Sequence, residues 1–94
     1  MKTLQLEEKY LTIVKSILDT LNVKASAFGS RAKNKARVLS DLDLCLLEDY
    51  DKTTVRRLQD AFEESDLPFK VDVVVWSDLS DSFKKQIQDD FITV

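Results

Sequence analysis

The sequence contains no histidine, and this absence restricts its chemistry more than any other feature of its composition. Histidine is the commonest general base and a usual ligand of zinc, so histidine triads and ordinary zinc sites are excluded. The single cysteine, Cys45, allows neither an internal disulfide nor a cysteine metal cluster. Any catalysis must therefore use carboxylates, hydroxyls, lysines and a hard metal ion bound through oxygen.

Glycine, proline and long apolar runs are equally scarce. Gly29 and Pro68 are the only residues of their types, which leaves little room for long irregular loops. No apolar run approaches the roughly 18–20 residues of a membrane span, and the first residues do not resemble a secretory signal. We therefore expect a cytoplasmic protein with no membrane contact. Ninety-four residues suffice for one modest core, so we expect one domain over residues 1–94.

Charge is nearly balanced but unevenly distributed. The net charge is −3, which disfavours general binding to nucleic acid across the whole surface. Residues 31–37 nevertheless carry four bases and no acid. Such a run can bind a ligand's phosphates, contact a partner protein or form a solvated face.

The apolar spacing predicts an α/β (α+β) protein with a small mixed sheet of three or more strands and helices packed on it. We expect helices at 6–21, at about 31–36, from 55 to about 65, and at 80–91. We expect strands at 23–28, 41–47 and 69–76, so that the element order is α-β-(α)-β-α-β-α. Within the second strand, alternation places Asp41 and Asp43 on one face and Leu42 and Leu44 on the other.

The aspartates of two strands are the candidate catalytic groups. Asp41 and Asp43 project from one face, and Asp72 is a single charge within the valine-rich third strand. If the two strands are neighbours, three carboxylates repel one another unless a cation lies between them. Oxygen ligands favour Mg²⁺ or Mn²⁺. Taken alone, an Asp-x-Asp pair is also typical of a solvated strand end.

Gly29 and Ser30 form a turn between the first strand and the short helix expected at 31–36. Gly29 permits close approach of a ligand, and the amides at a helix start attract anions. The turn is thus a candidate phosphate site, with the Ser30 hydroxyl a candidate for bonding a phosphate oxygen, although Gly-Ser is also an ordinary turn with a helix cap. Among the nearby bases, Arg31 and Arg37 are the better candidates for nucleotide binding, because a guanidinium can grip phosphate with two hydrogen bonds.

Together these residues resemble a known superfamily. Gly29-Ser30, ten intervening residues, Asp41-Leu42-Asp43 and a later Asp72 are similar to the nucleotidyltransferases that include DNA polymerase beta. The fuller run Gly-Ser-Arg-Ala…Ser-Asp-Leu-Asp-Leu resembles the minimal nucleotidyltransferase (MNT) domains, and the resemblance covers essentially the whole chain. It implies the nucleotidyltransferase fold, with a serine loop that holds the triphosphate and aspartates that carry two divalent metals and activate the acceptor hydroxyl.

The resemblance also implies a reaction and a partner. MNT domains typically act beside a HEPN-domain toxin as its antitoxin, transferring AMP from ATP to a toxin tyrosine. A chain of 94 residues leaves little structure to hold a small acceptor, which agrees with an acceptor carried on a partner protein. Two alternatives remain: an antitoxin that masks the toxin by binding, and a transferase that modifies a small molecule.

Overall fold

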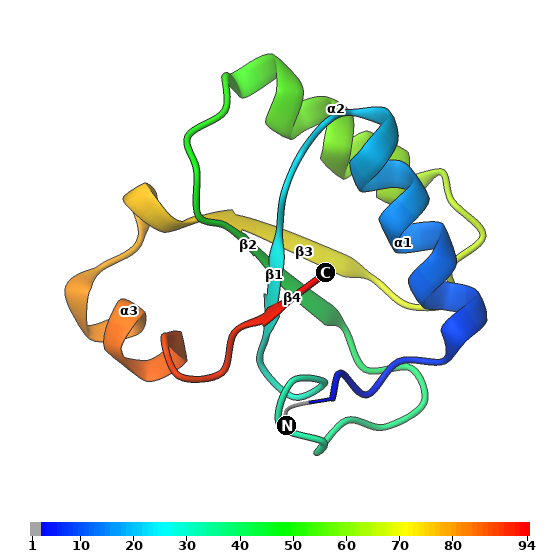
Figure 1. Ribbon diagram of the computed structural model, residues 1–94, viewed down its shortest axis with the longest axis horizontal. Coiled ribbons are helices and arrows are strands. Elements are labelled where there is room, and N and C mark those ends of the chain that lie inside the picture. Colours follow the sequence, from blue (N-terminus) through cyan, green and yellow to red (C-terminus); the bar gives the residue numbers. More distant parts are fainter. Residues whose placement is uncertain (1–2) are drawn as a thin grey trace.

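The computed structural model describes residues 3–94 and contains a four-stranded sheet flanked by helices (Figure 1). The helices of this part of the chain are α1 (Glu8–Thr20), α2 (Lys52–Glu63), α3 (Asp81–Ile87) and the short 3-10 helix η1 (Trp76–Asp78). The strands are β1 (Ser26–Phe28), β2 (Leu42–Leu46), β3 (Val71–Val75) and β4 (Ile92–Thr93). Across residues 3–94, no helix combines the length and apolar character that crossing a membrane requires.

The sheet is mixed, as the sequence predicted. Its strand order is β3-β2-β1-β4, with β1 antiparallel to both β2 and β4 and with β2 parallel to β3. The chain returns from β2 to β3 through α2, since parallel neighbours need a crossover connection. Strand β3 forms one edge of the sheet, so a ligand or a partner can reach it from the side.

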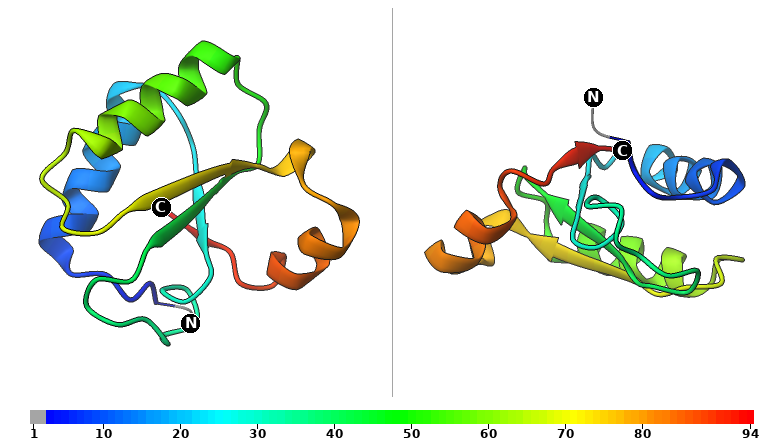
Figure 2. Two further views of the ribbon diagram at one scale, coloured as in Figure 1. Left: turned by 180° about the vertical axis from the view of Figure 1, so that it is seen from behind. Right: turned by 90° about the horizontal axis from the view of Figure 1, so that it is seen from below.

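Each face of the sheet carries its own apolar cluster. Helices α1 and α2 lie side by side over one face, and α3 lies on the other side of the molecule (Figures 1 and 2). The larger cluster joins α1 and α2 to the strands through fully buried side chains that include Val14, Leu44 and Leu58. The smaller cluster joins α3 to the sheet around Phe28, Cys45 and Ile87.

Alternation within β2 and β3 explains this two-sided packing. In β2, Leu42, Leu44 and Leu46 all face the larger cluster with no exposed surface, as predicted. In β3, Val71, Val73 and Val75 join the same cluster, whereas Val74 joins the smaller one. Successive side chains point to opposite faces, so the intervening aspartates must leave the larger core.

The structure corrects two sequence predictions. The helix expected at 31–36 does not form: the chain makes turns over residues 30–34, and Asn34 then adopts a left-handed conformation with φ of 57°, which ends any helix. The last helix ends at Ile87 rather than near residue 91, and the following residues form β4, which was not predicted. Pairing of Ala27 with Ile92 on the open edge of β1 stabilises this two-residue strand.

Candidate active site

The two candidate aspartates in strands lie directly beside each other. In the parallel pairing of β2 with β3, Asp43 is opposite Asp72. Asp41 lies one residue before β2 and is exposed. The topology therefore brings near one another three carboxylates that the sequence separates by up to 31 positions.

Gly29 closes the other side of this site. It follows β1 with φ of 77°, a conformation that L side chains rarely adopt. A Cβ added to Gly29 would overlap the Asp43 carboxylate at Oδ2, so the backbone of the turn packs directly against that side chain. The antiparallel pairing of Phe28 with Asp43 sets this approach. The single glycine thus stands at the position where the turn meets the aspartates.

The charges of the three aspartates affect one another. The pKa of Asp43 is raised to about 6, first by burial and then by the negative charges of Asp72 and Asp41. A carboxylate between two others is costly to ionise without a cation. This electrostatic coupling is the property expected of carboxylates that share a bound metal.

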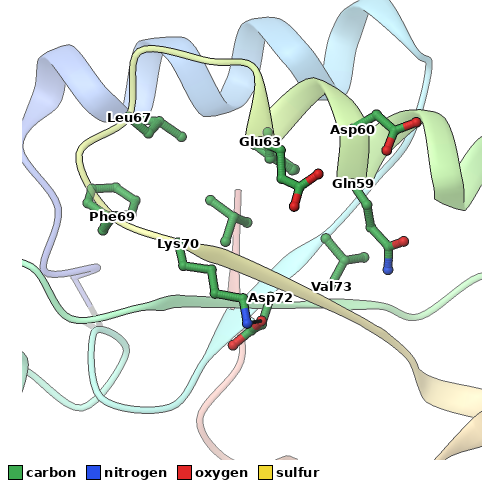
Figure 3. A pocket seen from close by; sticks show the side chains of 10 residues that line it. Gln59, Asp60, Glu63, Leu67, Phe69, Lys70, Asp72 and Val73 are labelled. Atoms are coloured by element: carbon green, nitrogen blue, oxygen red, sulfur yellow. Dashed lines mark ion pairs between the residues drawn. The ribbon is translucent and has the colours of Figure 1, made fainter.

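The carboxylates suit a divalent cation in chemistry and in backbone placement, but they do not converge on a single point. No group of three histidine, cysteine, aspartate or glutamate side chains in residues 3–94 is arranged to hold an ion. Asp72 Oδ1 instead pairs with Lys70 Nζ at 3.3 Å (Figure 3). Lys70 is exposed and Asp72 is partly exposed, so this ion pair contributes little to stability and does not fix the Asp72 carboxylate firmly.

A cleft of about 540 Å³ opens over Asp43 between the sheet and α3. Besides Gly29 and Asp43 it is lined by Lys33 and Asp90, which form an ion pair of 3.4 Å between Nζ and Oδ2. Asp90 Oδ2 is buried and accepts no hydrogen bond from any described residue. In the sequence, Lys33 is only one base of the run at 31–37, and Asp90 was not predicted to belong to the site. The sequence around each residue does not reveal their pairing, because only the return of the chain after α3 brings Lys33 and Asp90 together.

Arg31, which was predicted to bind nucleotide, is held by several contacts within the chain. It is only 5% exposed, and its guanidinium stacks 4.3 Å from the Phe69 ring. Four hydrogen bonds of 2.8–3.1 Å run from it to the backbone carbonyls of Gln5, Val38 and Ser40. Burial lowers its pKa, an effect that the charge of Asp41 opposes. Its donors are therefore used to hold the loop that leads to β2.

Arg37 does not line the cleft over Asp43. It is exposed and lines a neighbouring groove beside Pro68 and Phe69, and its contact with a nucleotide stays a prediction. Ser30 follows Gly29 and is half-buried, and its carbonyl accepts hydrogen bonds from the amides of Lys33 and Lys35. Gly29 thus packs against Asp43, whereas the donors of Arg31 are used within the loop and Arg37 lines the neighbouring groove.

Two sequence comparisons give this arrangement a family. Residues 7–94 match the family described as nucleotidyltransferase domain. The match covers almost the whole chain, and the mixed sheet with its flanking helices agrees with that fold. The chain belongs to the nucleotidyltransferase family and is a nucleotidyltransferase. Such enzymes generally use a nucleoside triphosphate and a divalent metal.

A relative from Haemophilus influenzae places the chain within the MNT branch of that family. The chain is 40% identical over 95 residues to a protein named "Probable protein adenylyltransferase MntA". The aligned region covers 97% of this chain and 83% of the relative. The similarity therefore extends over both the turn at Gly29 and the strands that carry the aspartates.

Proposed function

We propose that the chain is a magnesium-dependent protein adenylyltransferase that transfers AMP from ATP to a hydroxyl, a tyrosine in the first instance, of a HEPN-domain toxin. In this proposal the modification neutralises the toxin, so the chain acts as an antitoxin in the cytoplasm. The observation that carries the proposal is the pairing of Asp43 with Asp72 beside Gly29. The name of the MntA relative supports the choice of AMP as the group and of a protein as the acceptor.

In the proposed reaction the acceptor oxygen attacks the α-phosphorus, and the bond from that phosphorus to the bridging oxygen breaks to release pyrophosphate. Gly29 and Ser30 hold the triphosphate tail, since the absence of a Cβ at Gly29 lets phosphate approach the backbone. Asp72 takes the hydroxyl proton. It lies on the edge strand and its side chain is 41% exposed, so an acceptor can reach it from outside the sheet.

Asp41, Asp43 and Asp72 would hold the divalent ions. Mg²⁺, or Mn²⁺ in its place, would neutralise charge on the triphosphate and polarise the attacking oxygen. The raised pKa of Asp43 supports this assignment, because a cation removes the repulsion that raises it. The chain's own contribution is to place the two substrates in line and to exclude alternative geometries.

The test uses purified chain, Mg²⁺, ATP labelled at the α-phosphate and a HEPN-domain protein, sought first among the products of the neighbouring genes. We expect label on the HEPN protein and its loss with Asp41→Ala combined with Asp43→Ala. Asp19→Ala combined with Asp66→Ala removes the same charge from exposed positions outside the site and serves as the control. Undiminished labelling by the Asp41/Asp43 variant would refute the proposal.

The same variants separate catalysis from masking. If the Asp41/Asp43 variant protects cells from the toxin as well as the wild type does, the chain neutralises its partner by covering it. If it binds the toxin and fails to protect, group transfer is the neutralising step. Label that appears on a small molecule without any partner protein would instead identify a small-molecule transferase.

A further inference from the structure

The loop that leads into β2 presents two large aliphatic side chains to solvent. Val38 is 83% exposed and Leu39 is 64% exposed, and they are adjacent in sequence. Leu47, 49% exposed, is the third large apolar side chain exposed in residues 3–94 and lies at the opposite end of β2. Isolated exposed apolar residues are normal, but two neighbours beside a groove form a patch.

The exposure of this pair is maintained by an ordered loop. Arg31 donates to the carbonyls of Val38 and Ser40, and the Gln5 side chain both donates to and accepts from the backbone of Ala36 at 2.9 Å. Arg37 N also donates to Ser40 Oγ at 2.8 Å. A loop with this many internal bonds holds Val38 and Leu39 in one geometry, which lowers the entropic cost of a later contact.

A groove of about 560 Å³ continues the apolar surface from this loop. Its apolar walls are formed by Val38, Leu39, Leu6, Tyr10, Pro68 and Phe69. A concave apolar surface beside projecting aliphatic groups suits a partner that both inserts a side chain and receives one.

The charges around this surface indicate what the partner carries. Lys35 and Arg37 flank the loop, both are exposed, and neither has an ion-pair partner within residues 3–94. Glu7 also lines the groove, and its carboxylate pairs with Lys9 at 3.6 Å. The chain as a whole has a net charge of −3, so general attraction to anionic lipid or nucleic acid is weak. Local positive charge around an apolar centre instead complements a protein patch with an apolar middle and acidic edge.

The loop also lies where a protein acceptor would need to bind. Leu39 is two residues before Asp41, so their Cα atoms are at most about 7 Å apart. A protein seated on Val38 and Leu39 is therefore beside the candidate carboxylates. The edge position of β3 leaves the side of Asp72 open to the same partner.

We propose that Val38, Leu39 and the adjoining groove are the docking surface for the acceptor protein, which contacts them through an apolar patch bordered by carboxylates. This inference rests on the proposed function for the identity of the acceptor. It assigns to the loop the recognition of the protein substrate, separate from the binding of nucleotide at Gly29 and Ser30.

The test compares Val38→Ser combined with Leu39→Ser against Leu47→Ser, which alters an exposed aliphatic residue at the other end of β2. Binding of the HEPN-domain protein used in the transfer assay is measured by calorimetry, and AMP transfer is measured separately. We expect the loop variant to weaken binding and to raise KM for the protein by about tenfold or more, with KM for ATP changed less than about twofold. Leu47→Ser should leave all three values near those of the wild type.

Charge reversal provides a second variant that does not alter the apolar pair. Lys35→Glu combined with Arg37→Glu should weaken binding and reduce its dependence on salt, whereas Lys52→Glu combined with Arg56→Glu on α2 should not. Thermal melting checks that each variant remains folded. All of the substituted positions are exposed.

The outcomes separate the two proposals. Normal KM and affinity for the protein in the loop variant would overturn the docking surface while AMP transfer by the wild type still stood. Tight binding that depends on Val38 and Leu39 without any transfer would uphold the docking surface and refute the proposed function. Absence of binding by the wild type would overturn the docking surface. Loop-dependent sedimentation with phosphatidylserine-containing vesicles would overturn it in favour of a membrane contact.

Discussion

At the scale of single residues, the candidate site depends on one glycine and three carboxylates that each constrain the others. Gly29 leaves room for Asp43, and Asp43 is opposite Asp72 across two parallel strands. The pKa of Asp43 is raised to about 6 because it is partly buried and close to two other acids. The negative charge of Asp43 therefore lowers the stability of the fold unless a cation neutralises it.

Replacement of Asp43 by asparagine should stabilise the metal-free protein at neutral pH. A carboxyl whose folded pKa is raised from 3.8 to about 6 destabilises the fold progressively as pH rises through that window. The asparagine variant lacks this loss, so its advantage in melting temperature should be absent below about pH 4 and full above about pH 6. Thermal melts in EDTA from pH 4 to 7.5 measure it, with Asp19→Asn on α1 as the control. An advantage that is equal at both ends of this range would contradict the expectation.

Arg31 should behave as a structural residue. Arg31→Lys keeps the charge but loses the geometry of four hydrogen bonds to Gln5, Val38 and Ser40. We expect Arg31→Lys and Arg31→Met to lower the free energy of unfolding by similar amounts, about 2–4 kcal/mol. Urea unfolding gives these values. If the lysine variant is as stable as the wild type and only its KM for ATP changes, Arg31 binds the nucleotide instead.

At the scale of elements, α3 is the least secured part of the wall around Asp43. It has seven residues and belongs to the smaller apolar cluster rather than to the core beneath α1 and α2. Its attachment depends on aromatic contacts, among them the edge-to-face pair of Phe28 and Phe83 with centroids 6.1 Å apart. The cleft that Lys33 and Asp90 line is thus bounded by α3, a short helix held by the smaller apolar cluster.

Phe83→Ala should loosen α3 while leaving the larger core intact. We expect the free energy of unfolding to fall by about 1–3 kcal/mol, less than a fully buried Phe→Ala change because Phe83 is only partly buried. Hydrogen exchange should accelerate in α3 and stay unchanged in β2. Phe83→Leu, which keeps most of the apolar volume, is the matched control. Faster exchange spread evenly over β2 and α3 would show that the helix is part of the main cooperative unit.

At the scale of the whole molecule, ligand binding and folding should be linked through the sheet. The carboxylates come from two strands and the turn from a third, so a bound nucleotide and cation would join β1, β2 and β3. Ligands that bind only the folded state stabilise it by mass action.

Mg²⁺ with a non-hydrolysable ATP analogue at about one hundred times its Kd should add about 2.7 kcal/mol. For a domain of this size that corresponds to a rise in melting temperature of about 10–20 °C. EDTA should remove the rise, and so should Asp41→Ala combined with Asp43→Ala, whereas the Asp19/Asp66 control should retain it. An undiminished shift in EDTA would show that the nucleotide binds without a divalent cation.

Much of the fold followed from apolar periodicity. The structure confirms the helix predicted at 6–21, the strands predicted at 41–47 and 69–76 and the face that carries the leucines of β2. These were predictable because burial of one face imposes a period on neighbouring residues. The loop at 30–34 and strand β4 were not predicted correctly. Asn34 stops the first from becoming a helix, and β4 depends on an edge of β1 that no local pattern discloses.

The sequence alone determined the residue types and the two strand faces of this site: a single glycine before a serine, aspartates two apart, and a third acid among valines. Only the tertiary structure decided what the nearby bases contact, since it buries Arg31 in the loop, places Arg37 in another groove and brings Lys33 to Asp90. The physical reason is the distance along the chain over which each kind of interaction acts. Periodicity and turn chemistry act over a few residues, whereas the partner of a long charged side chain is set by segments that meet only in the folded chain.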